Sequence, residues 1–474
     1  MSQWKAIGAL ASDVQTGAAK AADLVEQALK TIEANKQFEA IIATTSQRAK
    51  ERAVEIDARV TKGEAVGRLA GVPFIAKDNF LAFGAETTAA SNILKGFNAP
   101  YQATAIEKLE AEGAICVAKA NLDAFAHGSS TENSDFFTTK NPHDETRVPG
   151  GSSGGSAAAV VLDMAPFALG TDTGGSIRQP AAFSGAVGYK PTYGLVSRSG
   201  VVAMASSTDV IGPITRTVDD AALVLDVIAG KDQLDGTTIE RDEAGYNIDA
   251  SELKGKKIGI VKEYMGEGLE PGVRAQIEAA IAKLKAAGAE ITEVSLPSLS
   301  AALAVYYIIV PAEISSNLGR YDGQRYGFSA SDVKDLEQSY DQSRSTGFGK
   351  EAKRRIMVGT YVLSSGYYDA YYKKAQTVRT KLINEFAEAF KTVDFLIGPT
   401  APSVAFKIGA NTDDPLKMYL TDIMTVAANL TGVPAISIPA GQSEGLPVGL
   451  QIMAAQKEDR TLLQVAKQVE ELLA

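Results

Sequence analysis

The sequence predicts an α/β protein with a large sheet that is covered by helices on both faces. Segments with the pattern of strands alternate with segments of helical periodicity over most of the chain. Apolar residues make up 45% of the 474 residues and charged residues 22%, proportions usual for a protein that buries a large core. The sequence contains no internal repeat, low-complexity tract or obvious linker. We therefore expect one main domain.

The N-terminal part has helical periodicity. Apolar residues recur at the spacing of an amphipathic helix over residues 13–35, and a second helix is expected over 46–60. The first strand-like segment comes only after these helices. We therefore expect a helical arm over residues 1–60, followed by a single domain over 61–474 whose motifs gather at about 70–215.

The rest of the chain alternates between the two patterns. Thr217 is followed by Asp220, the start of a capping box, and predicts the beginning of a helix. The polar, acidic stretch 231–255 is expected to be a surface excursion, and the tyrosine-rich stretch 300–390 to be largely helical. Strands are expected over 72–80, 114–118, 165–170, 257–261, 289–294, 394–397, 435–439 and 448–453. Further helices are expected over 103–112, after residue 155, and over 217–228, 272–287 and 459–473.

Charge and cysteine content exclude several classes of protein. The chain has 47 basic and 57 acidic residues and a net charge of −10, which argues against a broad basic face for nucleic acid. The single cysteine, Cys116, lies in an apolar run and cannot form an internal disulfide, so we expect a buried thiol and a cytoplasmic protein. No signal-peptide pattern and no run of about 18 apolar residues is present, so no membrane span is expected.

Two clusters of glycine and serine stand close together, at residues 150–156 (GGSSGGS) and 172–176 (DTGGS). Glycine lets the backbone approach a ligand closely. A hydroxyl beside free backbone N–H groups is what acyl transfer requires: a nucleophile, and donors for the oxyanion. Either cluster alone would also suit a flexible turn. Two of them flanking the apolar run 157–162 favour a catalytic site.

Several other glycine-rich or metal sites do not fit. Residues 150–154 match the nucleophile elbow of α/β-hydrolases, but the segment before them is loop-like and no histidine follows position 143. Only two histidines occur, so a zinc site is nearly excluded and no metal is expected. Neither 255–257 nor 349–351 completes a Walker motif, so the chain itself is not expected to bind a nucleotide.

A serine nucleophile without a histidine needs another proton acceptor. Lysine can take this role if burial lowers its pKa from about 10.4 toward neutrality. Lys77 is the candidate, because it follows the apolar strand-like residues 74–76. Composition by itself is also compatible with Lys77 being an ordinary lysine on the exposed face of a strand.

Three segments together resemble the amidase signature family: residues 77–79 (KDN), 150–156 and 172–180 (DTGGSIRQP). Their order and spacing are close to those of that family. The resemblance implies an amidase-signature fold with a large central mixed sheet. It also implies a triad in which Ser176 is the nucleophile, Lys77 the base and Ser152, after a cis Gly151–Ser152 peptide, the proton relay. The implied oxyanion hole is formed by the backbone N–H groups of Thr173, Gly174, Gly175 and Ser176.

Further stretches resemble the A subunits of tRNA-dependent amidotransferases, which act on Glu-tRNA(Gln) or Asp-tRNA(Asn). They are residues 190–198, 205–213, 353–359 with 364–372, and 414–422. This likeness implies that the chain hydrolyses glutamine and supplies ammonia within a cytoplasmic heterotrimer with subunits B and C. It implies no cofactor in this chain. ATP and Mg²⁺ would be used, and Glu-tRNA(Gln) mainly contacted, by a partner subunit.

Glutamine is a zwitterion, so its site needs a cation and an anion. The resemblance offers Arg355 for the carboxylate and Asp422 for the ammonium, with Tyr306 nearby and Tyr307 as the alternative register. Without the resemblance, Arg355 would be a charge on a helix surface and Asp422 a residue at a helix N-terminus. One departure is His127, where relatives more often have methionine, and we expect it to be neutral.

Two other functions compete with this interpretation. A free-standing amidase acting on small amides would share the triad but would not require Arg355 and Asp422. A structural subunit that has lost catalysis would not need to keep Lys77, Ser152 and Ser176, all of which are present.

Overall fold

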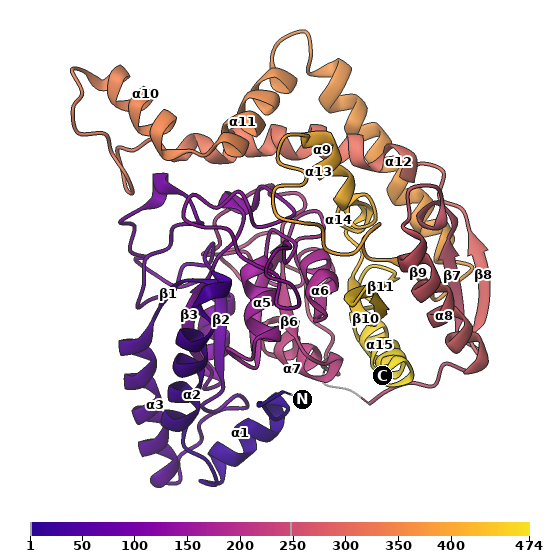
Figure 1. Cartoon of the computed structure of the whole chain (residues 1–474), viewed down its shortest axis with the longest axis horizontal. Helices are drawn as coiled ribbons and strands as arrows, with labels where there is room; N and C mark the ends of the chain where they lie inside the picture. The colour runs from indigo at the N-terminus through magenta and orange to yellow at the C-terminus, as the bar shows by residue number, and fades with distance from the viewer. Residues whose placement is uncertain (1, 247–248) are drawn as a thin grey trace.

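An eleven-stranded sheet runs through the protein (Figure 1). The computed structural model describes residues 2–246 and 249–474, so that residues 247 and 248 of the expected surface excursion lie outside it. The strands are β1 (Ile41–Thr44), β2 (Pro73–Lys77), β3 (Ile115–Ala120), β4 (Phe167–Asp172), β5 (Val187–Lys190), β6 (Val210–Thr215), β7 (Lys257–Val261), β8 (Glu290–Val294), β9 (Phe395–Pro399), β10 (Ala435–Ser443) and β11 (Leu446–Ala454). Their order across the sheet is β1-β3-β2-β4-β6-β5-β10-β11-β9-β7-β8.

The sheet is mixed. β2 runs parallel to β3 and β4, and β7 runs parallel to β8 and β9. The other neighbours are antiparallel. The predicted α/β class with a large mixed sheet is confirmed.

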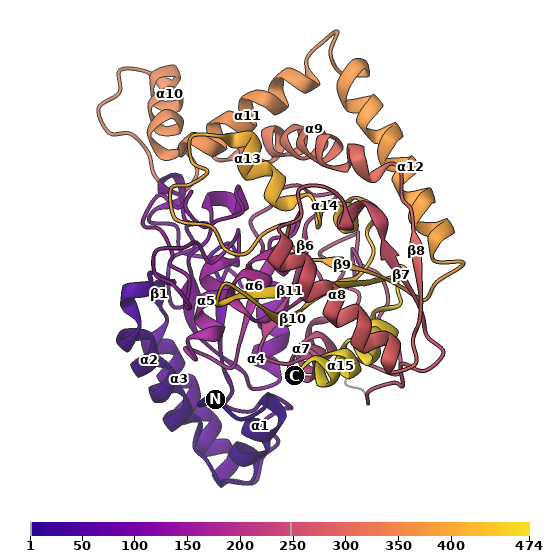
Figure 2. The ribbon, with the colours of Figure 1, turned by 45° about the vertical axis from the view of Figure 1, so that its right-hand side comes forward.

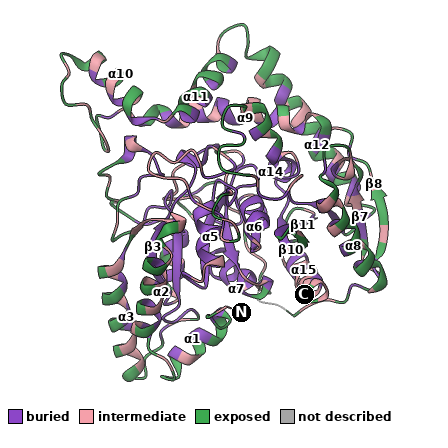
Figure 3. Ribbon diagram, in the orientation of Figure 1, coloured by how far each residue is buried: buried purple, intermediate pink, exposed green. Residues whose placement is uncertain are grey.

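Helices pack on both faces of this sheet. The helices are α1 (Ile7–Gln15), α2 (Ala21–Ala34), α3 (Ser46–Thr61), α4 (Thr104–Ala111), α5 (Gly154–Val161), α6 (Arg178–Ser184), α7 (Val218–Ile228), α8 (Pro271–Ala286), α9 (Leu299–Asn317), α10 (Leu336–Gly347), α11 (Lys350–Leu363), α12 (Lys374–Ala389), α13 (Pro415–Tyr419), α14 (Val426–Thr431) and α15 (Asp459–Leu473). α5 and α6 pack together against the central strands, and α7 and α15 pack together on the opposite face. The central strands and α5 and α6 are almost wholly buried (Figure 3).

The structure corrects several expected elements. The single helix expected over residues 13–35 is two helices, because the chain turns at Gly17, whose φ is +75°. The N-terminal arm also contributes β1, a four-residue edge strand paired with β3, which is too short for an alternating pattern to identify it. β5, β6 and α6 were not expected either. β6 contains Pro213, a residue that argues against a strand.

Other elements follow the sequence closely. The Thr217 hydroxyl accepts a hydrogen bond from the Asp220 amide at the start of α7, as the capping pattern predicted. β7, α8 and β8 form the expected βαβ unit with parallel strands. The division of the chain at residue 60 stays a prediction.

α9 is the most apolar long helix among the described residues. Together with the turn that follows, residues 299–320, it is long and apolar enough to cross a membrane, but half of its apolar window is buried. It packs against α11, α12 and α14, as a core helix does. Figures 1 and 2 show α9, α11 and α12 forming a layer over one end of the central sheet.

Glycines in the sheet allow α5 and α6 to lie close to it. A Cβ added to Gly170 in β4 would lie 2.9 Å from Ser153 Oγ, and one added to Gly188 in β5 would lie 2.6 Å from Ala181 Cβ. A larger side chain at either position would push the helices away from the strands. The close approach places the serine-bearing starts of both helices beside the ends of β2 and β4.

The contact between β2 and β4 allows a test of how much core packing between these strands stabilises the fold. The buried rings of Phe74 and Phe167 stack with centroids 5.3 Å apart and face each other across the two strands, a few residues before the ends of these strands. We expect Phe167→Ala to lower the free energy of unfolding by about 3–5 kcal/mol, because it leaves a cavity in a packed core. Chemical denaturation followed by circular dichroism measures the change. Val54→Ala, at an exposed position, is the control, and an equal effect of both substitutions would contradict the prediction.

Candidate active site

Lys77 ends β2 and points its amine into the interior. The residue is 0% exposed. Its Nζ donates to Ser152 Oγ at 2.8 Å and to Thr171 Oγ1 at 2.9 Å. Burial lowers the pKa of Lys77 to about 7, against the opposing attraction of Asp123, Asp172 and Asp209. A large fraction of this lysine is therefore neutral near physiological pH.

Thr171 is a residue of this site that the sequence did not single out. Its hydroxyl accepts from Lys77 and also from Asn79 Nδ2 at 3.1 Å. It lies one residue before the DTGGS cluster and on the strand beside that of Lys77. Only the pairing of β2 with β4 brings the two side chains together, so the signal is absent from the local sequence.

The two glycine–serine clusters meet at this point. The peptide between Gly151 and Ser152 is cis, as the resemblance implied. Ser176, which is 7% exposed, lies just before α6, and its carbonyl accepts from the Ser153 amide at 3.1 Å. The structure thus brings Lys77, Ser152 and Ser176 to one place. Over the described parts of the chain, no hydrogen bond joins the hydroxyls of Ser152 and Ser176.

Asp172 holds the loop that carries Ser176. Its carboxylate accepts from the amides of Gly175 and Ile177 at 2.8 and 3.2 Å, on either side of the serine. Arg178 donates to it through Nε at 3.0 Å and Nη2 at 2.9 Å, and both residues are fully buried. Burial by itself would raise the pKa of Asp172, but Arg178 overcomes this and lowers it to about 2. The loop is therefore anchored by an ionised carboxylate.

This anchoring narrows the oxyanion hole that the resemblance implied. The Gly175 amide is one of the four implied donors, yet it is already bonded to Asp172. The amides of Thr173, Gly174 and Ser176 make no hydrogen bond to any residue that the structure describes. They are the donors left for an oxyanion. Thr425 Oγ1 donates to the Gly174 carbonyl at 2.6 Å and fixes that peptide.

Tyr306 and Tyr307, both on α9, contact different parts of the site. A Cβ added to Gly174 would lie 2.6 Å from Tyr306 Cζ, so the Tyr306 ring lies directly against the loop 172–176. Tyr307 donates its hydroxyl to Asp422 Oδ2 at 3.0 Å. Both rings are therefore at the site, with Tyr306 on the side of Ser176 and Tyr307 on the side of the charged residues.

Arg355 and Asp422 are brought together through Tyr307. The Arg355 guanidinium lies 5.3 Å from the Tyr307 ring centroid, and its residue is only 3% exposed. Asp422 ends the 3₁₀ turn Leu420–Asp422 and accepts from Ser129 Oγ at 2.7 Å. Burial raises the pKa of Asp422 to about 6. A buried cation and a buried anion therefore lie on two sides of one tyrosine.

His127 is fully buried near this pair. Neither ring nitrogen has a partner among the described residues, and burial lowers the pKa of the imidazole well below its ordinary value, so the ring is neutral. It is in ring contact with Phe125 at 6.1 Å between centroids. Nothing in these contacts links it to Lys77, Ser152 or Ser176.

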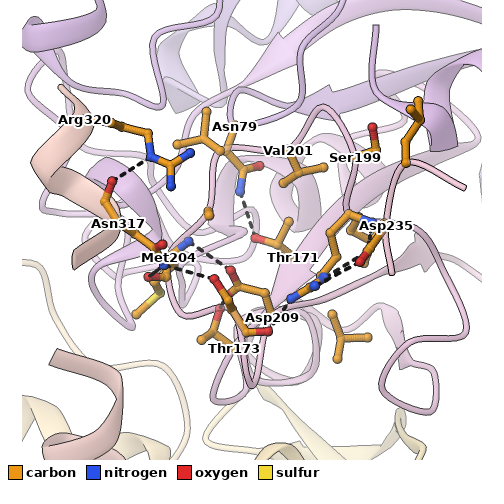
Figure 4. A pocket seen from close by; sticks show the side chains of 17 residues that line it. Asn79, Thr171, Thr173, Ser199, Val201, Met204, Asp209, Asp235, Asn317 and Arg320 are labelled. Atoms are coloured by element: carbon orange, nitrogen blue, oxygen red, sulfur yellow. Dashed lines mark hydrogen bonds and ion pairs between the residues drawn. The ribbon is translucent and has the colours of Figure 1, made fainter. Parts of the chain in front are cut away.

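A cavity of about 260 Å³ lies beside the residues that surround Lys77 (Figure 4). Asn79, Thr171 and Thr173 line it, and Asp209 faces into it beside them. The Thr173 hydroxyl donates to Asp209 at 2.6 Å. The cavity thus borders Thr171, which contacts Lys77, and the start of the loop 172–176.

Residues 2–246 and 249–474 contain no candidate metal site. No three His, Cys, Asp or Glu side chains gather there in a way that could hold a metal ion.

The Asp172–Arg178 pair gives a testable stability effect. Asp172→Asn would leave Arg178 as an uncompensated buried charge and should lower the free energy of unfolding by about 3–5 kcal/mol at neutral pH. Because the pKa is lower in the folded protein, the stabilisation is present above the ordinary aspartate pKa and is lost as the pH falls toward 2. Denaturation at several pH values measures the gap between wild type and variant. A gap equal to that of Asp332→Asn, at an exposed position, would contradict the role of the pair.

Comparison with known proteins finds relatives that match almost the whole chain. The chain is 55% identical over 435 residues to the A subunit of glutamyl-tRNA(Gln) amidotransferase from Caldanaerobacter subterraneus subsp. tengcongensis, covering 92% of this chain and 89% of the relative. It is 52% identical over 452 residues to the protein of the same name from Geobacillus thermodenitrificans, covering 95% of this chain and 93% of the relative.

Solved structures show the same architecture. The crystal structure of the A subunit of glutamyl-tRNA(Gln) amidotransferase from Thermotoga maritima matches with a TM-score of 0.80 and 42% identity over 95% of this chain and 91% of that chain. Native peptide amidase from Stenotrophomonas maltophilia matches with a TM-score of 0.82 and 30% identity over 99% and 97%. The model of the amidase family matches residues 23–463. The chain therefore belongs to the amidase family, whose signature its glycine–serine clusters predicted.

Proposed function

We propose that the chain is the glutamine-hydrolysing A subunit of a glutamyl-tRNA(Gln) amidotransferase. The observation that carries this proposal is a buried cation and a buried anion, Arg355 and Asp422, in the same site as a serine that is hydrogen-bonded to a buried lysine. Free amino acids carry one carboxylate and one ammonium, and this pair of charges fits both. The names of relatives more than 50% identical over almost the whole chain support the same function.

In the proposed reaction, neutral Lys77 accepts the proton of Ser152, to which it is already hydrogen-bonded. Ser152 then takes the proton of Ser176, and Ser176 Oγ attacks the side-chain carboxamide carbon of glutamine. The C–O bond forms as the carbonyl π bond breaks, and negative charge develops on the carboxamide oxygen. The free amides of Thr173, Gly174 and Ser176 are the donors for that oxyanion.

Collapse of the tetrahedral intermediate breaks the C–N bond. The proton held by Lys77 returns through Ser152 to the leaving nitrogen, and ammonia is released. Water then attacks the acyl-serine with the same base, which gives glutamate and regenerates Ser176. One water is consumed for each glutamine.

Within the proposed complex, ammonia is used by a partner. We propose a cytoplasmic heterotrimer with subunits B and C, in which the partner activates Glu-tRNA(Gln) with ATP and Mg²⁺. The net charge of −10 suits a chain that leaves the tRNA contacts to that partner. The polar cavity lined by Thr171, whose hydroxyl contacts Lys77, supplies space for a small released product (Figure 4).

Ammonia release tests this function. The purified chain should release ammonia from glutamine weakly when alone, and strongly with subunits B and C, ATP and Glu-tRNA(Gln). Ser176→Ala should abolish the release in both settings, because it removes the nucleophile. Arg355→Ala should raise KM for glutamine by about tenfold or more, because the carboxylate loses a charged hydrogen-bond partner.

Ser300→Ala, on the surface, is the matched control for the serine substitution. Strong activity on other small amides that is indifferent to the partners would make the chain a free-standing amidase. Retained hydrolysis by Ser176→Ala would overturn the assignment of the nucleophile.

The pKa of Lys77 sets a pH dependence. The base must be neutral, so with a pKa of about 7 we expect kcat to rise as the pH increases through about 7 and then to level off. Below about pH 6, protonation of Asp422 should in addition raise KM, because the ammonium loses its anion. Rates measured from pH 5 to 9 at saturating and at low glutamine separate the two effects.

Lys77→Arg keeps a long basic side chain but removes the proton acceptor, because a guanidinium stays protonated. We expect it to lower kcat by a factor of about 10²–10⁴. Lys62→Arg, on the surface, should leave the profile unchanged. A wild-type kcat that is flat between pH 6 and 8 would contradict the role of Lys77 as the base.

A further inference from the structure

Glu351 is a buried carboxylate one helical turn before Arg355. It lies in the first turn of α11, and its side chain is 9% exposed. Its Oε1 accepts from Arg355 Nε at 2.8 Å and from the Tyr419 hydroxyl at 3.0 Å, and its Oε2 accepts from Arg354. No step of the proposed reaction uses this carboxylate.

The direction of the contact leaves one edge of Arg355 free. A guanidinium has donors on Nε and on both Nη atoms, and the two Nη groups form a fork that matches a carboxylate. Glu351 occupies Nε. The Nη groups of Arg355 make no hydrogen bond to any part of the chain that the structure describes. The end of the guanidinium thus stays available for a ligand carboxylate.

Aromatic rings fix the plane of the same guanidinium. It lies 5.3 Å from the Tyr307 ring centroid and 5.6 Å from that of Tyr419. The two rings stack at 3.8 Å with 19° between their planes. Tyr419 is bonded to Glu351 and Tyr307 to Asp422. Glu351 therefore belongs to one connected cluster that ends at the proposed ammonium site.

Charge gives Glu351 a second effect on Arg355. A buried arginine without a counter-ion strongly destabilises the folded protein. Glu351 supplies that counter-ion when no substrate is bound. Burial tends to raise the pKa of Glu351, but Arg355 and Arg354 overcome this and hold it below its ordinary value. The carboxylate therefore stays ionised, and the arginine stays in place.

We propose that Glu351 is a positioning residue for substrate binding: it holds Arg355 by Nε so that both Nη groups face the α-carboxylate of the bound amino acid. This inference rests on the proposed function, because it takes glutamine as the ligand of Arg355. On this proposal, Glu351 lowers KM for glutamine relative to an amide without an α-carboxylate, although Glu351 itself need not touch the substrate.

The test compares glutamine with glutaminamide, in which the α-carboxylate is replaced by a carboxamide. In the assembled complex, Glu351→Ala should raise KM for glutamine by about tenfold, leave kcat nearly unchanged, and leave KM for glutaminamide unchanged. Glu351→Gln keeps an oxygen acceptor for Nε but not the counter-charge, and should restore KM for glutamine in part, to a value between those of Glu351→Ala and the wild type. A purely structural role would not produce this split between substrates.

Glu26→Ala is the matched control, since Glu26 forms an exposed i,i+4 pair with Lys30 on α2. If Glu351→Ala does not fold, Tyr419→Phe removes one hydrogen bond to Glu351 and should raise KM for glutamine in the same direction by a smaller factor. If the wild type prefers glutamine and neither Glu351→Ala nor Tyr419→Phe changes that preference, this inference is wrong while the proposed function stands. A wild type with no preference for glutamine over glutaminamide would overturn the carboxylate-binding role of Arg355 and this inference with it.

Discussion

Lys77 carries its amine into a part of the protein that water does not reach, and burial lowers its pKa to about 7. That single desolvated group explains much of the surrounding structure. The amine needs acceptors, and Ser152 and Thr171 provide them. The adjacent strands and the closely packed starts of α5 and α6 exclude water from the amine. An exposed lysine on the same strand would keep a pKa near 10 and would be a poor base at neutral pH.

Around this neutral amine the protein places charged groups that are paired before substrate arrives. Asp172 and Arg178 neutralise each other and hold the amides on both sides of Ser176. Glu351 and Arg355 form a second pair, farther along the site. Unpaired buried charges are costly, so these pairings allow cations and anions to exist in an interior that also desolvates Lys77. The same interior would strengthen electrostatic interactions with a bound zwitterion.

Several parts of the fold could be predicted from local sequence. The capping residues of α7 and the β7–α8–β8 unit follow from patterns that span a few residues, and the structure confirms them. β1 and β6 could not be predicted in this way. β1 is four residues long at a sheet edge, and β6 contains a proline, so both depend on strands supplied from elsewhere in the chain. The break between α1 and α2 depends on one glycine within an otherwise helical pattern.

The sequence by itself determined which serines and which lysine stand in the signature segments and, through resemblance, which arginine and aspartate are proposed to bind the substrate. These are properties of residue type, order and spacing. Only the tertiary structure decided that Thr171 contacts Lys77, that Asp172 occupies the Gly175 amide, and that Tyr307 and Glu351 connect Arg355 to Asp422 and Tyr419. Those contacts join different strands and helices. The direction of a hydrogen bond and the burial of an amine are fixed by how these elements pack, which no local pattern encodes.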